Sequence, residues 1–184
     1  MKKNAIIPAR GGSKRIPRKN IKLFLGEPII SYSIRTALDS NLFDEVMVST
    51  DDEEIAGIAL KFGASVPFLR SGESSKDTST TIDVINEVIF NYKQTGKIFD
   101  YTCCIYPCAP FINKEILLSS YRKLDSNGYD CIFPVIKYGH PIQRALRITE
   151  KHKIEMINPE NMQIRTQDLE ALFHDLGQFY FFKT

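Results

Sequence analysis

Short apolar runs alternate with longer amphipathic stretches along most of the chain. The apolar runs have the length of strands and predict strands at residues 4–8, 44–50, 65–68, 101–107, 130–136 and 177–182. The amphipathic stretches predict helices at residues 28–39, 51–63, 81–92 and 114–124. Between these elements we expect a polar loop over residues 70–80 and an irregular segment over residues 137–167.

Helix start and stop signals agree with these boundaries. Pro28 stands in the first turn of its helix, and the helix over residues 51–63 has acids in its first turn and Gly63 at its end. Apolar strands that alternate with helices indicate a doubly wound α/β fold, in which helices cover both faces of a mostly parallel, Rossmann-like sheet. With 184 residues, 43% of them hydrophobic, the chain suits a single domain over residues 1–184.

The sheet topology predicts where a ligand binds. In open α/β sheets, ligands lie beyond the carboxyl ends of the strands. We therefore expect the loops after Pro8, Thr50 and Tyr106 to line one edge of the sheet and to form the site.

The loop after Pro8 carries a concentration of positive charge. Between residues 10 and 22 it has six basic residues and no acid, namely Arg10, Lys14, Arg15, Arg18, Lys19 and Lys22. The whole chain has a net charge of only +2, so acids outnumber bases elsewhere. One positive loop on a nearly neutral protein favours a site for a single anionic ligand. The alternative, a nucleic-acid-binding module, predicts an affinity that falls steeply with salt.

Small residues in the same loop favour phosphate as that anion. Gly11 and Gly12 permit a positive φ and let backbone amides approach an anion, while Ser13 and Lys14 add a hydroxyl and an ammonium group. The loop is neither a Walker A motif nor a dinucleotide fingerprint, because GxxxxGK[ST] and GxGxxG are both missing. The alternative is a solvated basic turn.

Cysteine and histidine spacing excludes other kinds of site. There is no CxxC pair, so we expect reduced, buried thiols at Cys103, Cys104, Cys108 and Cys131. Metal-ligand spacing is also missing from His140, His152 and His174. Pro8 and Arg10 interrupt the first apolar run, so we expect no signal peptide, and no run approaches the ~18 residues of a membrane span. These features indicate a cytoplasmic protein.

Four segments resemble one enzyme family. The segment IIPARGGSKRIPRKNIK (6–22) closely resembles the N-terminal signature of the acylneuraminate cytidylyltransferases. Further matches follow in order: FLRSGESSKDTSTTIDVI (68–85), YPCAPF (106–111) and RTQDLEALFHDLGQFYFF (165–182). The combination of the last two is most similar to the pseudaminic acid cytidylyltransferase branch.

The resemblance implies a GT-A-like nucleotidyltransferase fold and a reaction. Enzymes of this family transfer CMP from CTP to a nine-carbon acidic sugar and release pyrophosphate. It also implies Mg²⁺ that bridges the phosphates, and a homodimer formed through the irregular segment. Alternatives within the family are CMP-N-acetylneuraminate and CMP-legionaminate synthetases. The alternative from another class is a nucleotide-binding protein without catalysis.

The resemblance also assigns roles to residues. Catalytic contacts to phosphate are implied for Arg10 and Lys19. The nucleotide-binding set is Ala9, Gly11, Gly12, Ser13, Lys14, Asn20, Arg70 and Thr81, with Asp77 inside the same motif. The sugar-binding set is Tyr106, Pro107, Arg165, Gln167, Asp175 and Gln178. Without the resemblance, residues 70–81 suggest only a polar loop and a capped helix start. Residues 165–169 suggest only an exposed helix start.

Two departures from the family pattern bear on the substrate and the metal. Sialic acid relatives place glutamine where this chain has Tyr106, which favours pseudaminic acid over Neu5Ac. The family carries an aspartate-x-aspartate motif beyond its last strand, associated with the divalent metal. The sequence through Thr184 does not include that motif, so the metal ligands stay open.

Overall fold

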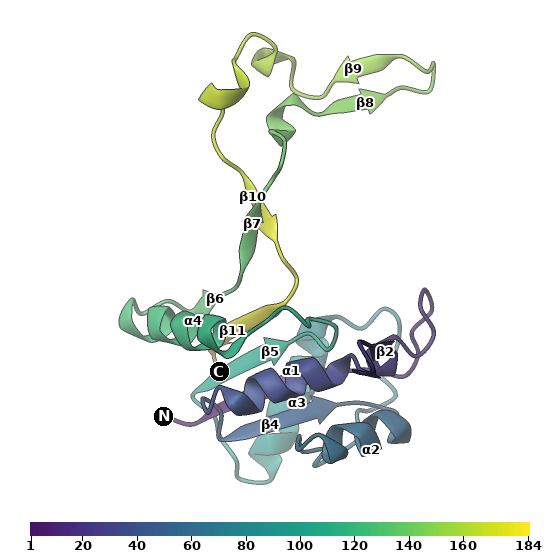
Figure 1. Ribbon diagram of the computed structural model, residues 1–184, viewed down its shortest axis with the longest axis vertical. Coiled ribbons are helices and arrows are strands. Elements are labelled where there is room, and N and C mark those ends of the chain that lie inside the picture. The colour runs from purple at the N-terminus through teal and green to yellow at the C-terminus, as the bar shows by residue number, and fades with distance from the viewer. The chain divides into compact units, whose positions relative to one another are not determined.

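A five-stranded sheet lies at the centre of the first of two units into which the chain divides. The computed structural model describes residues 1–184. The first unit holds Met1–Phe133 and Gly177–Thr184, and the second holds Pro134–Leu176. The strand order is β4-β1-β5-β11-β6 (Figure 1). Its strands are β1 (Lys3–Pro8), β4 (Glu45–Ser49), β5 (Tyr101–Ile105), β6 (Cys131–Ile132) and β11 (Phe179–Lys183).

The sheet is mostly parallel, as predicted. Strand β1 pairs in parallel with both β4 and β5, so that Ile6 lies between Met47 and Cys104. Strand β11 pairs antiparallel with β5 and with β6, and therefore runs opposite to the other four strands. The apolar pattern of a buried strand is the same in both directions, so the sequence did not predict this reversal.

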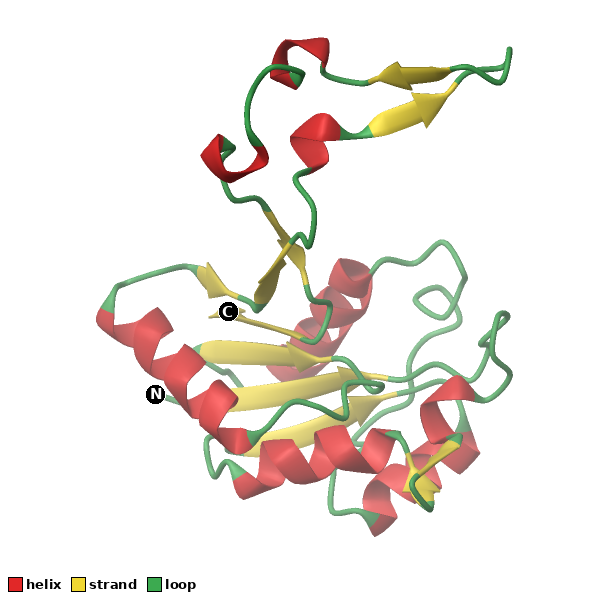
Figure 2. Cartoon of the chain, turned by 45° about the horizontal axis from the view of Figure 1, so that its top comes forward, coloured by secondary structure: helices red, strands yellow, loops and turns green.

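Helices cover both faces of the sheet (Figure 2). One face carries α1 (Ile30–Asp39), α2 (Glu53–Lys61) and α4 (Lys114–Ser126), whereas α3 (Thr81–Gln94) covers the other. Successive side chains of β1 point to opposite faces. Ile7 accordingly joins the core cluster of α1, α2 and α4, whereas Ile6 joins the cluster of α3.

Side-chain caps begin three of these helices close to the predicted positions. The carboxylate of Asp52 accepts from the Ile55 N–H at 3.0 Å, and Asn113 accepts from the Ile116 N–H at 2.9 Å. Thr80 forms a capping box with Asp83. Helix α1 begins later than predicted, because Pro28 belongs to a hairpin of β2 (Leu23–Phe24) and β3 (Glu27–Pro28) that the sequence did not predict.

Two predicted strands are wrong in extent. Residues 65–68 form only one isolated bridge, between Met47 and Ser65. The strand predicted over residues 130–136 is divided into β6 and β7 (Val135–Lys137), with Pro134 in the break. A proline has no N–H to donate to a strand ladder, which accounts for the interruption.

The second unit contains short elements where an irregular segment was predicted. Strand β7 pairs antiparallel with β10 (Phe173–Asp175), and β8 (Leu146–Ile148) pairs with β9 (Ile154–Met156). Short 3₁₀ helices are Ile142–Arg144, Pro159–Asn161 and Thr166–Asp168 here, and Lys19–Ile21 in the first unit. That the two units form one domain stays a prediction.

Cysteine burial follows position in the sheet. All four cysteines are free thiols. Cys103 and Cys104 lie in the buried strand β5, and Cys108 is half-buried. The expectation of burial is wrong for Cys131, which is exposed on the short edge strand β6. None of the helices combines the length and the apolar character that crossing a membrane requires.

Candidate functional site

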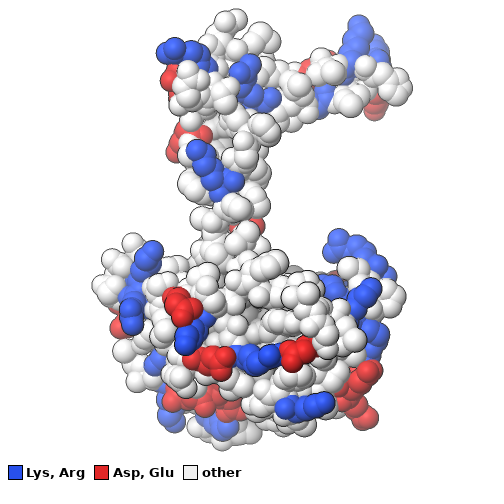
Figure 3. Space-filling model, in the orientation of Figure 1, with Lys and Arg blue, Asp and Glu red and all other residues white.

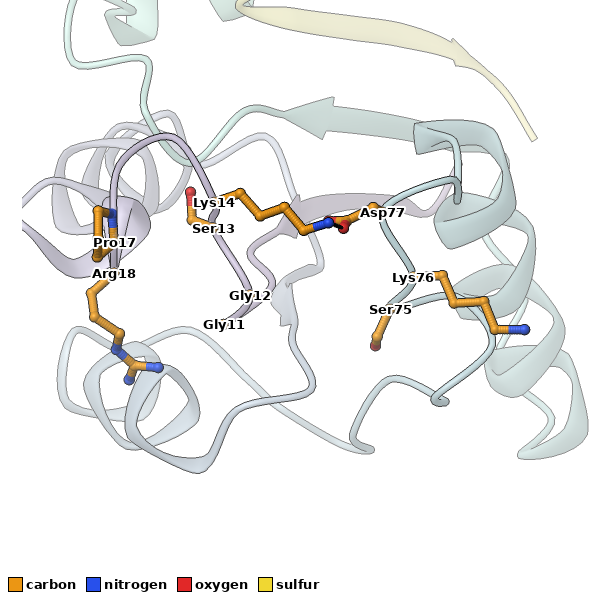
Figure 4. A pocket seen from close by; sticks show the side chains of 9 residues that line it. All are labelled: Gly11, Gly12, Ser13, Lys14, Pro17, Arg18, Ser75, Lys76 and Asp77. Atoms are coloured by element: carbon orange, nitrogen blue, oxygen red, sulfur yellow. Dashed lines mark ion pairs between the residues drawn. The ribbon is translucent and has the colours of Figure 1, made fainter.

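A pocket of about 860 Å³ opens beyond the carboxyl ends of β1 and β5, at the predicted edge of the sheet. Its walls come from the loop after β1, the loop before α3 and the loop after β5. The structure brings together nine predicted site residues there: Arg10, Ser13, Lys14, Lys19, Asn20, Arg70, Thr81, Tyr106 and Pro107. An adjoining pocket of about 520 Å³ shares Ser13, Lys14 and Asp77 and adds Gly11 and Gly12 (Figure 4).

The lining of the larger pocket is strongly positive. Its cationic side chains are Arg10, Lys14, Arg15, Lys19, Arg70 and Lys76. Asp77 is the one acidic residue among the lining residues. Figure 3 shows Lys and Arg gathered on the side of the first unit where the loop after β1 lies. Such an excess of cations around one cavity attracts a polyanion such as a triphosphate.

Other predicted site residues do not line this pocket. Ala9 is buried, and its N–H donates to the Ser49 carbonyl at 2.9 Å, which is a structural contact. Gln178 accepts at its carbonyl from the Tyr106 N–H at 2.9 Å. The second unit contains the other three, Arg165, Gln167 and Asp175. The nucleotide role of Ala9 stays a prediction, and so do the sugar roles of the other four residues.

Asp77 joins two of the predicted phosphate-binding cations. Its Oδ1 lies 2.8 Å from Nη1 of Arg10, and its Oδ2 pairs with Nζ of Lys14. Figure 4 shows Lys14 reaching across to Asp77. The hydrogen bond from Lys14, and then the charges of Lys14 and Arg10, hold the pKa of Asp77 below its usual value. Asp77 is therefore ionised at neutral pH and neutralises part of the loop.

The glycines of the loop act differently from the prediction. Neither Gly11 nor Gly12 has a positive φ, and the Gly11 N–H donates to Oδ1 of Asp51 at 2.8 Å. The Gly11 amide is therefore bound to a carboxylate, and contacts of Gly11 and Gly12 with a phosphate stay a prediction. Glycine is instead needed at position 11 because the main chain there passes close to the Asp52 side chain. A Cβ on residue 11 would lie 2.5 Å from Oδ2 of Asp52. Arg18 adopts the left-handed conformation in this loop, with φ 53°.

Arg18 attaches the other end of the loop to the start of α2. Its guanidinium pairs with Asp52, with Nη2 2.9 Å from Oδ1, and also with Glu54. In Figure 4 the Arg18 side chain points away from Asp77. Gly11 and Arg18 thus fix both ends of residues 12–17 on acids near the start of α2. The sequence identified these acids only as a helix-start signal, because nothing local pairs segments 34 residues apart.

Asn20 and Arg70 line the pocket and donate hydrogen bonds to main-chain carbonyls beside it. Asn20 is buried; its Nδ2 donates to the Arg10 carbonyl at 3.0 Å, and its Oδ1 accepts from Sγ of Cys108 at 3.5 Å. The buried guanidinium of Arg70 donates to the Ser49 carbonyl at 2.6 Å and to the Ser49 hydroxyl at 3.1 Å. Burial lowers the pKa of Arg70 from its ordinary value. Both side chains are held rigidly by the main chain.

Tyr106 forms an apolar wall with a polar edge. Its ring packs edge-on against Tyr180, with centroids 5.8 Å apart, and its hydroxyl lies 3.4 Å from the Thr81 hydroxyl. Its carbonyl accepts from the Ser33 hydroxyl at 2.9 Å. Tyr180 and Thr81 hold the ring and its hydroxyl, and Ser33 holds the main chain, so Tyr106 presents a defined surface to a ligand.

The residues of this chain do not by themselves fit a divalent metal. No group of three or more His, Cys, Asp or Glu side chains is placed to hold an ion. The carboxylate of Asp77 in the pocket is already paired with two cations. A cation next to it would have to replace both partners.

Among solved structures, the fold resembles CMP:2-keto-3-deoxy-manno-octonic acid synthetase complexed with CTP. The TM-score is 0.73 at 18% sequence identity, over 100% of this chain and 74% of the other. At this identity the likeness shows the fold alone, an α/β nucleotidyltransferase fold with a mostly parallel sheet.

Comparison with known sequences identifies the family. The chain is 46% identical to the pseudaminic acid cytidylyltransferase of Campylobacter jejuni subsp. jejuni serotype O:2, over 98% of this chain and 78% of that protein. It is 38% identical to N-acylneuraminate cytidylyltransferase A of Danio rerio, over 98% of this chain and 41% of that protein. The family model for cytidylyltransferases matches residues 4–182. The chain therefore belongs to the cytidylyltransferase family.

Proposed function

We propose that this chain acts in the cytoplasm, where it transfers CMP from CTP to pseudaminic acid and releases pyrophosphate. The observation that carries the proposal is the pocket at the carboxyl ends of β1 and β5, in which Arg10, Lys19 and Arg70 face one cavity. The 46% identity to a pseudaminic acid cytidylyltransferase supports the substrate. Four free thiols suit a reducing compartment.

The chemistry requires positive charge at the phosphates. The anomeric hydroxyl of the sugar attacks the α-phosphorus of CTP, a new P–O bond forms, the bond to the leaving pyrophosphate breaks, and the hydroxyl proton passes to water. Negative charge on the phosphoryl oxygens is stabilised by cations held in place before the reaction. Arg10 and Lys19 line the pocket, and the hydrogen bond from Asn20 holds the main chain of Arg10.

Replacing Arg10 with alanine is expected to lower turnover by about 10²-fold, the usual effect of losing one preorganised charge donor. Lys19→Ala should behave similarly. Lys22→Ala removes a charge from the same segment but outside the pocket lining, and should retain normal turnover. The measurement is pyrophosphate release at saturating CTP, with circular dichroism to check folding.

Three results would change this assignment. A folded Arg10→Ala variant with normal turnover would remove Arg10 from the mechanism. A Lys19→Ala variant that loses only CTP affinity would show that Lys19 binds the ground state. Calorimetric binding of CTP without pyrophosphate release would instead support a nucleotide-binding protein without catalysis.

The same proposal includes Mg²⁺ that enters together with CTP. Mg²⁺ commonly retains several waters and is held by substrate phosphates with one or two carboxylates, so a preformed protein cage is unnecessary. We expect no heat from Mg²⁺ alone in calorimetry, and loss of pyrophosphate release when EDTA is added to the assay. Tight Mg²⁺ binding without CTP would contradict it.

Tyr106 is proposed to select the sugar. A primary amide both donates and accepts hydrogen bonds, whereas a tyrosine ring offers an apolar face and one distant hydroxyl. Pseudaminic acid carries a methyl group and an acylated nitrogen where Neu5Ac carries hydroxyls, so it loses less against an apolar wall. The ring is held by Tyr180 and Thr81, which supports a defined recognition surface.

With CTP and Mg²⁺ present, kcat/KM for pseudaminic acid should exceed that for Neu5Ac by at least ~10²-fold, because a mismatched polar group in a binding site is strongly rejected. Pyrophosphate release measured with each sugar separately gives the two kcat/KM values and their ratio, and legionaminic acid serves as a third substrate. Tyr106→Gln should reduce the preference. Equal rates for the two sugars in the wild-type enzyme would show that Tyr106 does not select the sugar.

A homodimer formed through the second unit is also proposed. No side chain of Pro134–Leu176 is buried. Ile148 and Ile154, paired across β8 and β9, are 76% and 69% exposed. A unit that buries so little apolar surface gains little free energy by itself, and a second copy is a partner that can cover it.

Sedimentation of the wild-type chain should therefore give a dimer. Ile148→Asp combined with Ile154→Asp should give a monomer, because two charges would be buried in the interface. Lys151→Ala changes a residue of the same hairpin without removing apolar surface and should stay dimeric. A wild-type chain that is monomeric at assay concentration would contradict the proposed homodimer.

A further inference from the structure

Asp77 bridges two cations from another part of the chain. It belongs to the loop before α3, whereas Arg10 and Lys14 belong to the loop after β1. One carboxylate oxygen pairs with each cation, and the carboxylate forms no other hydrogen bond or ion pair. Asp77 is thus bound only to side chains that we assign to phosphate binding.

The geometry is that of an anion in a phosphate site. A phosphate group also presents neighbouring oxygens that can accept from an arginine and a lysine at once. The carboxylate therefore makes the same kind of contact with Arg10 and Lys14 that a phosphate of CTP would make. Both cannot hold the two cations through the same contacts.

The Asp77 contacts can be exchanged at low cost. The Asp77 side chain is 39% exposed, and the Lys14 side chain is 78% exposed. Ion pairs exposed to solvent contribute little to stability, so a multiply charged ligand can replace them. Asp77 also lies on a loop that has no helix or strand between Arg70 and Thr80, and this loop lines the same pocket.

We propose that Asp77 is an internal competitor for the phosphate-binding cations. It pairs with Arg10 and Lys14, is displaced when CTP binds, and pairs with them again as pyrophosphate leaves. Asp77 thereby lowers the affinity of the site for phosphate anions and favours release of the product. This inference rests on the proposed function, because it requires that Arg10 and Lys14 bind phosphates.

A purely structural role for Asp77 makes the opposite prediction. If the carboxylate served to hold the two cations in the geometry that phosphate needs, its removal would weaken anion binding. As a competitor, its removal strengthens anion binding. The sign of the change in affinity therefore separates the two roles.

The decisive measurement is calorimetry with pyrophosphate at fixed ionic strength on the full chain. Asp77→Asn, which keeps the side-chain shape, should bind pyrophosphate roughly fivefold more tightly than wild type, the scale expected of two exposed ion pairs. Asp77→Ala should change in the same direction. Glu53→Gln is the control for net charge, because it removes an exposed acid that does not line the pocket and is not paired with a pocket cation, and it should stay within about twofold of wild type.

Turnover gives a second readout of the same competition. The inhibition constant of pyrophosphate in the assay should fall by the same factor in Asp77→Asn and stay near the wild-type value in Glu53→Gln. Unchanged or weaker pyrophosphate binding by both Asp77 variants would overturn the proposal. An equal gain in Glu53→Gln would overturn it too, since net charge alone would then explain the effect.

A double variant separates failure of this inference from failure of the proposed function. Arg10→Ala with Lys14→Ala should weaken pyrophosphate binding, and adding Asp77→Asn to it should then have no effect. If the double variant binds pyrophosphate as well as wild type, the assignment of the phosphate site is wrong, and the inference is rejected with it. If the double variant binds weakly but Asp77→Asn alone gains nothing, the site is right and only the competitor role is rejected.

Discussion

The pairing of β1 between β4 and β5 is the constraint on which the site depends. Ala5, Ile6 and Ile7 are completely buried, and β1 is parallel to both neighbours. Parallel pairing brings the carboxyl ends of the three strands to one edge of the sheet. The loops that leave this edge have no strand partners and can carry polar side chains. A shift of β1 by one residue would exchange the side chains that face α1 and α3.

Positive charge at this edge is held by carboxylates from other segments. Arg18 pairs with Asp52 and Glu54, and Arg10 and Lys14 pair with Asp77. The first set fixes the loop to α2, where Asp52 is also the helix cap. The second set lies in the pocket and is open to exchange. One set of acids therefore holds the loop in place, and a different acid pairs with the cations of the pocket. The ion pairs in the pocket can change while the loop stays attached to α2.

The second unit buries much less of its apolar surface than the first. In the first unit, both faces of the sheet are buried under helices. In the second, pairs of short strands leave large apolar side chains such as Leu146 and Phe173 in contact with solvent. Two-stranded hairpins are marginally stable alone in water, so these strands need further apolar surface to pack against.

The sequence by itself determined the four helices of the first unit, the strands β1, β4, β5 and β11, the edge where the pocket lies and the family. Hydrophobic periodicity, caps and the basic loop are local properties, and each is complete within a few residues. Only the tertiary structure decided the reversed direction of β11, the contact that requires Gly11 to be a glycine, and the placement of Arg165 in the second unit. It also decided which acids pair with Arg10 and Arg18. These features join segments distant in the chain, and no local pattern specifies which distant carboxylate will meet a given cation.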